Sequence, residues 1–179
     1  MNNTKTAVNE QPPKLRIKNF DEVSGRYSSE EAIMEAKRCI QCKNTGCVGG
    51  WPVNVYIPQF IKEVAAGNFV EAYRVLKMQN SLPAVCGRVC PQEKQCESKC
   101  VRGLKGEPVA IGRLERFTAD YFMENYKEEE IEIKKNGIKT AVIGAGPAGI
   151  ACAGELAKMG YDVTIFEALH IPGGVLVYG

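Results

Sequence analysis

Cysteines in two short segments are the residues of this sequence with the clearest capacity for chemistry. Seven of the eight cysteines fall in these segments. They are Cys39, Cys42 and Cys47 in the first segment and Cys86, Cys90, Cys96 and Cys100 in the second. The polar N-terminus lacks the apolar core of a signal peptide, so we expect a cytoplasmic protein whose thiols stay reduced. Clustered reduced thiols indicate a metal centre.

The spacing of these thiols favours an iron–sulfur cluster. Such clusters take four ligands, mostly thiolates, and short intervals let neighbouring thiolates reach different irons. Structural zinc favours pairs of ligands two to four residues apart. Only Cys39 and Cys42 form an x2 pair, and the second segment contains a Cys90-Pro91 step. Zinc and inert buried thiols are the alternatives, and the spacing fits both less well.

Trp51 stands where the first run of cysteines would continue. Three residues separate it from Cys47 and Pro52 follows it, which is the position of the last cysteine in a common cluster-binding run. An indole offers only an N–H donor and cannot bind iron. A cluster that needs a ligand at this position is therefore one ligand short.

A glycine-rich turn near the end of the chain indicates nucleotide binding. An apolar, β-branched run at 139–143 leads into the pattern G-x-G-x-x-G, and a second such run ends at Glu167. The glycines allow a tight turn that brings a pyrophosphate to a helix N-terminus, and the acidic residue accepts the ribose hydroxyls. The predicted residues of the turn are Gly144, Gly146, Pro147, Ala148 and Gly149.

Two features of this region favour FAD over NAD. The turn has the form Gly-Pro-Ala-Gly at 146–149, and a Pro-Gly-Gly step follows at 172–174. The glycines of that step are Gly173 and Gly174, whose role in binding the flavin follows from the family resemblance described below. An ordinary turn is the alternative interpretation of the step.

Apolar periodicity predicts the helices and loops that carry the cysteines. Ser28 and Glu31 form a capping box, and Gly67 separates the two helices of an expected hairpin. Expected helices cover 28–41, about 57–66, 68–76 and 109–126, and expected loops cover 43–58 and 83–106. A strand at 139–143, a helix to about 159 and a strand at 162–167 then form a βαβ unit.

Composition is that of an ordinary globular protein, with 45% hydrophobic residues, 25% charged residues and a net charge of +2. There is no basic stripe for nucleic acid, and no apolar run reaches the roughly 18 residues that span a bilayer. We therefore expect neither nucleic acid nor a membrane as partner. The expected organisation is a flexible N-terminal arm at 1–14, a helical iron–sulfur domain at 15–127, a linker at 128–137 and an incomplete FAD-binding domain at 138–179.

The predicted fold is a mainly α iron–sulfur domain of the α-helical ferredoxin-like kind, followed by a truncated α/β FAD-binding (Rossmann-like) βαβ unit. Two parallel strands do not cover both faces of a parallel sheet. The sequence is therefore interpreted as part of a considerably longer protein. In isolation, the segment after Gly137 is expected to self-associate or to be partly disordered.

Several stretches resemble the small (beta) subunit of NADPH-dependent glutamate synthase. They are Cys39–Cys42, Pro52–Pro58, Leu82–Pro91, Gln92–Glu97 and Ile111–Phe117. The same module occurs in the flavin subunit of NADH-dependent ferredoxin:NADP oxidoreductase and at the N-terminus of dihydropyrimidine dehydrogenase. The resemblance covers about residues 15–179, nearly the whole sequence.

The resemblance implies two 4Fe–4S clusters in the helical domain. One would be held by Cys39, Cys42, Cys47 and Cys100. The other would use Cys90, Cys96, Glu115 and a cysteine at the position of Trp51. The first site keeps all its thiolates. The second lacks one ligand, so its cluster is expected to be lost, reduced to three irons or rescued by Cys86.

Glu115, Cys86 and Cys152 each have a simpler structural interpretation. Without the resemblance, Glu115 would reach solvent or pair with a base such as Arg88 or Arg113. Cys86 is expected to pack as a small hydrophobic residue. Cys152 lies in the expected βαβ helix, where a small residue suits packing of the helix against the sheet.

The resemblance also implies an electron-transfer function. In the full-length protein, NADPH bound in a later βαβ unit would reduce FAD, which lies close to Gly173 and Gly174. Electrons would leave through the clusters to the large glutamate synthase subunit, where 2-oxoglutarate and glutamine yield glutamate. One alternative is that the same iron–sulfur and FAD-binding module passes electrons to another acceptor, such as ferredoxin, a pyrimidine or a sulfur compound. Another is a non-redox adapter that docks a partner.

Overall fold

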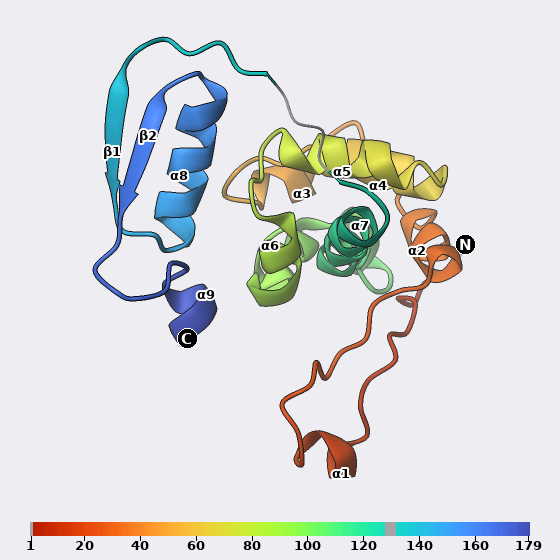
Figure 1. Cartoon of the computed structure of the whole chain (residues 1–179). Helices are drawn as coiled ribbons and strands as arrows, with labels where there is room; N and C mark the ends of the chain where they lie inside the picture. The colour runs from red at the N-terminus through yellow and green to blue at the C-terminus, as the bar shows by residue number, and fades with distance from the viewer. Residues whose placement is uncertain (1, 128–131) are drawn as a thin grey trace. The chain divides into compact units, whose positions relative to one another are not determined.

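The computed structural model describes residues 2–127 and 132–179 of the chain. They divide into two compact units, residues 2–127 and residues 132–179 (Figure 1). Residues 128–131 of the predicted linker lie outside the described residues, and 132–137 contain no helix or strand. Within the described residues, no helix combines the length and the apolar character needed to cross a membrane.

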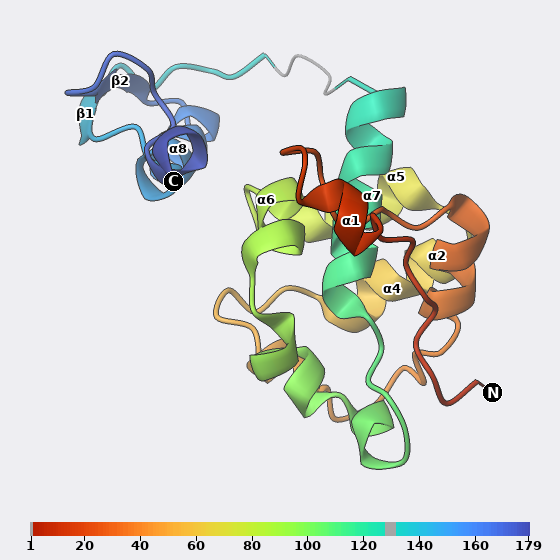
Figure 2. The same ribbon diagram turned by 90° about the horizontal axis from the view of Figure 1, so that it is seen from below.

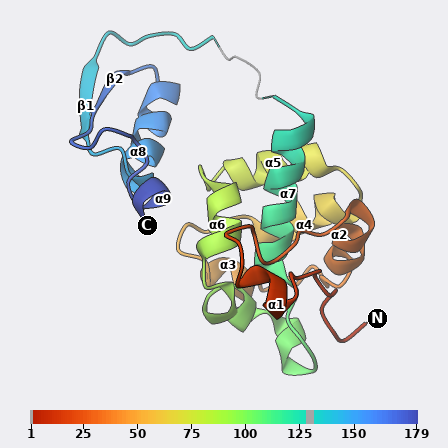
Figure 3. The ribbon, with the colours of Figure 1, turned by 60° about the horizontal axis from the view of Figure 1, so that its bottom comes forward.

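The first unit is helical. Its helices are α1 (Pro13–Arg16), α2 (Ser29–Ala36), α3 (Gly46–Gly49), α4 (Ile57–Ala65), α5 (Phe69–Lys77), α6 (Pro83–Val89) and α7 (Ile111–Asn125). Short 3₁₀ turns follow α6 at Gln92–Lys94, Glu97–Lys99 and Val101–Leu104. Helix α7 packs along α6 and also contacts α4 and α5 (Figure 2, Figure 3). Its buried Ile111, Leu114 and Phe117 join Phe60 and Ile61 of α4 in the main apolar core.

The capping box predicted at the start of α2 is confirmed. The Ser28 hydroxyl accepts a hydrogen bond from Glu31 N at 3.2 Å, and Glu31 Oε2 accepts one from Ser28 N at 2.8 Å. The predicted end of this helix at 41 is wrong, because α2 stops at Ala36. The backbone leaves the helix in a turn, in which Cys39 N donates a hydrogen bond to Ala36 O at 3.0 Å and Gln41 has a φ of 50°. The first cysteines therefore lie in an irregular turn.

The predicted helical hairpin is confirmed as α4 and α5. Gly67 lies between them with a φ of 81°, a conformation that glycine adopts without steric cost. Its N–H bonds to Val64 O at 3.0 Å and ends α4. The helix predicted at 109–126 is also present, as α7.

The prediction of a loop from Pro83 onward is wrong, because α6 begins at this residue. Proline suits the first position of a helix, where its missing N–H has no helical partner. Gly87 then lets α6 pack directly on α7, since an added Cβ there would lie 2.7 Å from the Cα of Arg116. Tertiary packing thus stabilises a short helix that carries Cys86.

Residues 2–6, within the segment predicted as a flexible N-terminal arm, lie against the helical unit. Thr6 is 8% exposed, and its carbonyl oxygen accepts a hydrogen bond from Tyr27 Oη at 2.8 Å. Further along, Gln11 N bonds to Val23 O at 2.8 Å and closes a hairpin with α1 at its tip (Figure 1). The polar side chains suggested solvation, whereas the backbone of this segment pairs with buried groups.

The second unit contains the predicted βαβ arrangement. Its elements are β1 (Lys139–Ile143), α8 (Pro147–Lys158), β2 (Asp162–Phe166) and α9 (Val175–Tyr178). The strands are parallel, with Lys139 opposite Asp162 and Ile143 opposite Phe166. Helix α8 lies beside this two-stranded sheet (Figure 1). Helix α9 was not predicted.

Cys152 was expected to pack between α8 and the sheet, and this prediction is wrong. Its side chain is exposed, and the next residue, Ala153, is buried instead. The helix therefore turns Cys152 toward solvent. Ile143 and Phe166, at the ends of the two strands, are exposed as well.

Candidate iron–sulfur and nucleotide-binding sites

Four thiols from the two cysteine segments line one pocket of the helical unit. They are Cys39, Cys42, Cys47 and Cys100. Cys39 and Cys42 follow α2, Cys47 lies in α3, and Cys100 lies between two 3₁₀ turns. The rest of the wall is largely apolar and includes Ile57, Ile61 and Ile111. The fold thus brings together the first predicted ligand set.

Burial and neighbouring thiols disfavour unbound thiolates in this pocket. Burial raises the pKa of the Cys39 thiol and raises that of Cys47 to about 11, and Cys100 adds to both shifts. Thiolates that line one apolar pocket repel one another, so the group is stable either protonated or bound to metal. Four soft sulfur donors fit a 4Fe–4S cluster.

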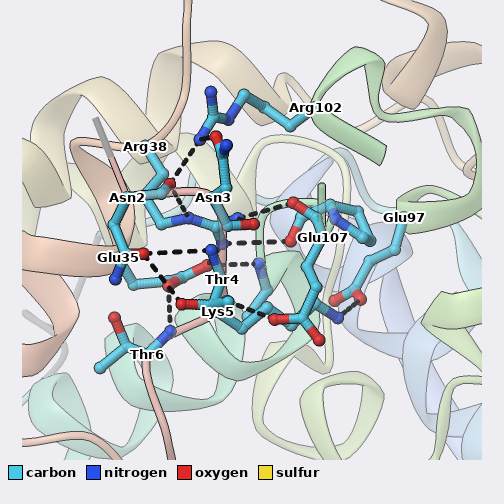
Figure 4. A network of polar contacts seen from close by, with 12 residues as sticks. Asn2, Asn3, Thr4, Lys5, Thr6, Glu35, Arg38, Glu97, Arg102 and Glu107 are labelled. Atoms are coloured by element: carbon cyan, nitrogen blue, oxygen red, sulfur yellow. Dashed lines mark hydrogen bonds and ion pairs between the residues drawn. The ribbon is translucent and has the colours of Figure 1, made fainter. Parts of the chain in front are cut away.

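A buried ion pair fixes the end of α2, just before Cys39. Glu35 and Arg38 are 0% and 3% exposed, and Glu35 Oε1 lies 2.5 Å from Arg38 Nη1 (Figure 4). Glu35 Oε1 also accepts a hydrogen bond from Ala110 N at 2.8 Å. Arg38 Nη2 donates to Glu107 O at 2.6 Å. The pair therefore joins the first cysteine segment to the start of α7.

The N-terminal segment 2–6 extends this network (Figure 4). Thr6 N donates to Glu35 Oε2 at 2.7 Å, and Lys5 N donates to Glu107 Oε2 at 2.6 Å. The Lys5 ammonium forms an ion pair with Glu97, which lies between the last two cysteines of the second segment. The segment thus connects the two cysteine segments. Sequence analysis did not predict this role. In the structure, Glu35 is one of the buried residues of α2.

The second predicted ligand group surrounds Glu115, which is fully buried. Its Oε1 accepts a hydrogen bond from Asn80 Nδ2 at 2.7 Å, and its Oε2 has no partner among the residues that the structure describes. Burial raises the pKa of this carboxyl well above its usual range. The alternative of a pair with Arg88 is wrong, because Arg88 donates to Asp120 at 2.9 Å. An unpartnered buried carboxylate oxygen fits the role of a metal ligand.

Cys90 and Cys96 lie near this carboxyl. Burial, together with the charges of Glu97, Cys90 and Glu115, raises the pKa of Cys96 to about 12. Trp51 is 5% exposed and packs in the same apolar core as Cys96. An indole at this point supplies no metal ligand. In the described part of the chain, no three His, Cys, Asp or Glu side chains are close enough to share one metal ion.

The glycine-rich turn of the second unit has the geometry that a dinucleotide requires. Gly144 has a φ of 93°, and Gly146 precedes α8, whose first residues are Pro147 and Ala148. An added Cβ at Gly149 would lie 1.9 Å from Gly144 O. The bare backbone at the N-terminus of α8 therefore fits a pyrophosphate.

Glu167 and the second glycine pair lie at the same turn. Glu167 Oε2 accepts a hydrogen bond from Ala145 N at 2.7 Å, and bonds from Leu169 N and Ala145 N lower the pKa of its carboxyl. Gly173 N donates to Ala145 O at 2.8 Å. An added Cβ at Gly174, where φ is 55°, would lie 2.9 Å from the Cα of Gly146. The structure therefore brings the predicted nucleotide-binding residues together.

Comparison with known proteins identifies the class. Residues 16–127 match the family described as dihydropyrimidine dehydrogenase domain II, 4Fe–4S cluster. Residues 142–176 match the NAD(P)-binding Rossmann-like domain. The chain belongs to the domain II 4Fe–4S family and joins this domain to a Rossmann-like unit.

Its relatives include subunits of two kinds of oxidoreductase. The glutamate synthase [NADPH] small chain of Escherichia coli K12 is 38% identical over 169 residues, which cover 94% of this chain and 36% of that protein. The NAD-dependent dihydropyrimidine dehydrogenase subunit PreT of the same organism is 40% identical over 164 residues, or 89% of this chain and 39% of that protein. The chain thus spans 36–39% of the length of these relatives.

Replacing Glu35 by Gln should lower the free energy of unfolding of the helical unit by about 3 kcal/mol, because Arg38 would stay buried without its counter-charge. Urea unfolding followed by circular dichroism measures the change. Glu71→Gln is the matched control, since its i,i+3 partner Arg74 is exposed and the expected loss is below about 0.5 kcal/mol. Equal losses in the two variants would contradict the role of the buried pair.

Replacing Gly149 by Ala should weaken FAD binding about tenfold or more, because the new Cβ forces the turn to open. Titration of the apoprotein with FAD, followed by flavin fluorescence, measures the affinity. Gly154→Ala in α8 is the control, since an added Cβ there meets no atom within 4 Å. Unchanged affinity in Gly149→Ala would show that the turn does not hold the cofactor.

Proposed function

We propose that this chain is the iron–sulfur and FAD-binding part of a cytoplasmic, NADPH-dependent oxidoreductase of the glutamate synthase small-subunit type. The observation that carries the proposal is the pocket lined by Cys39, Cys42, Cys47 and Cys100. Two cysteine segments that are distant in sequence supply four thiols to one apolar space. Membership of a 4Fe–4S family supports this assignment.

The first thiol group would hold one 4Fe–4S cluster, which supplies one-electron transfer when bound. The residues of the chain shape its surroundings. Ile57, Ile61 and Ile111 restrict the access of water to the thiols, and the Glu35–Arg38 pair holds the segment that carries Cys39. Each thiol gives up its proton on binding iron, so raised thiol pKa values make metal binding depend on pH.

The second unit would bind FAD, and NADPH would bind in a part of the full-length protein beyond this sequence. Backbone N–H groups at the start of α8 would hold the pyrophosphate. Each Glu167 carboxylate oxygen accepts one backbone hydrogen bond and keeps a lone pair for a ribose hydroxyl. Gly173 and Gly174 carry no side chain that would block the flavin. Hydride chemistry belongs to the flavin itself.

The proposed electron acceptor is the large subunit of a glutamate synthase, which would form glutamate from 2-oxoglutarate and glutamine. Small chains of glutamate synthase from Escherichia coli and Azospirillum brasilense support this choice, at 38% and 37% identity. The nearly equal identity to PreT, 40%, favours a pyrimidine ring as the second candidate acceptor. The two candidates share every residue role assigned above.

The two acceptors can be separated with the full-length protein. After reduction by NADPH, it should be reoxidised at least about tenfold faster by the large glutamate synthase subunit with its substrates than by a dihydropyrimidine dehydrogenase catalytic subunit with a pyrimidine. Stopped-flow absorbance of the flavin measures both rates. The reverse order would favour the pyrimidine.

Protein purified without oxygen should contain at least about four irons and four acid-labile sulfides per chain, together with FAD. Cys100→Ala should lower both counts by about four, because it removes a ligand of the first site. Cys152→Ala, which changes an exposed thiol of the second unit, should leave them unchanged. Zinc without sulfide in a folded protein would refute the redox proposal and favour a partner-docking adapter.

A further inference from the structure

The close contact between α6 and α7 brings a cysteine and a carboxyl together. Gly87 approaches the backbone of Arg116 so closely that an added Cβ would lie 2.7 Å from its Cα. The preceding residues of the two helices are Cys86 and Glu115. Asn80 links their side chains, since its Nδ2 donates to Glu115 Oε1 at 2.7 Å and its Oδ1 accepts from the Cys86 thiol at 3.6 Å.

Two further thiols lie around the same carboxyl. Cys90 N donates to Cys86 O at 3.1 Å, so these cysteines are one helical turn apart and share a face. Cys96 is 1% exposed and comes from the following 3₁₀ segment.

The free oxygen of Glu115 suits a metal ligand. Glu115 Oε2 is buried and accepts no hydrogen bond from any of the three thiols or from another described residue. The described residues also hold no three such ligands close enough for a single ion. A single zinc ion draws its ligands to about 2.0–2.3 Å, whereas an iron–sulfur cluster spreads its ligands over several irons.

Trp51 fills the neighbouring space without offering a ligand. The residue before it, Gly50, lies against the second cysteine segment, where an added Cβ would be 3.2 Å from the Cα of Cys96. The Trp51 side chain is buried in the core that includes Cys96. The fourth ligand of a cluster at Glu115 must therefore come from elsewhere.

We propose that Cys86, Cys90, Cys96 and Glu115 hold a second iron–sulfur cluster, with Cys86 supplying the ligand that Trp51 does not. This inference rests on the proposed function. As each sulfur–iron bond forms, the thiol proton passes to solvent, and the carboxyl of Glu115 likewise loses its proton on binding through Oε2. Asn80 keeps its hydrogen bond to Oε1 and so orients the carboxylate.

The test is iron and acid-labile sulfide per chain after anaerobic purification, with EPR of the reduced protein. The unmodified chain should hold about eight of each, and Cys86→Ala about four, because one cluster is lost. Alanine is small and favours helix, so α6 should persist, which circular dichroism checks. Cys152→Ala is the control and should keep about eight. Adding Trp51→Cys to Cys86→Ala should restore the second EPR signal.

Alkylation of the unmodified chain gives a measurement that no folding defect can obscure. With iron bound, mass spectrometry should find Cys86 protected from iodoacetamide and Cys152 modified, and removal of iron should expose Cys86. Modification of Cys86 while all iron remains bound would overturn the inference. An iron content of about four per chain that requires Cys39 but does not require Cys86 would also overturn the inference. That result would leave the proposed function intact. Absence of both iron and sulfide would refute the proposed function as well.

Discussion

The ion pair between Glu35 and Arg38 is the interaction on which the arrangement of the helical unit depends. Both charges are removed from water, and such a pair is stable only when its remaining donors and acceptors are satisfied. Here those partners are the backbone of Thr6, Glu107 and Ala110, which belong to segments far apart in sequence. The pair therefore connects the N-terminal segment, α2 and the start of α7. These connections determine the geometry of the first thiol pocket.

Glu35 and Glu115 show how differently a buried carboxylate can be used. Each is fully buried. Glu35 has partners on both oxygens, including a guanidinium, which is the pattern of a structural residue. Glu115 has an amide on one oxygen and no hydrogen-bond partner on the other among the residues described. Since burial without a partner is costly, the contrast distinguishes a residue that holds the fold together from one that is proposed to bind metal.

Sequence patterns predicted the elements that local signals determine. The apolar stripes of α4, α5 and α7, the capping box at Ser28 and the glycine-rich βαβ turn were all found in this way. Helix α6 and the docked segment 2–6 were missed, because their stability comes from contacts with distant residues. The first thiol group was predicted from cysteine spacing and family resemblance. Asn80, which orients Glu115, carried no local signal that spacing or periodicity could reveal.

The exposed side chain of Cys152 gives the molecule a natural attachment point for a spectroscopic probe. Among the described residues, the other cysteines are buried or half-buried. Cys152 lies in α8, the helix that begins at the glycine-rich turn. A maleimide dye or nitroxide fixed there would lie on the helix that is proposed to receive the pyrophosphate. Its signal would report how that turn responds to an arriving nucleotide, without altering any thiol of the helical unit.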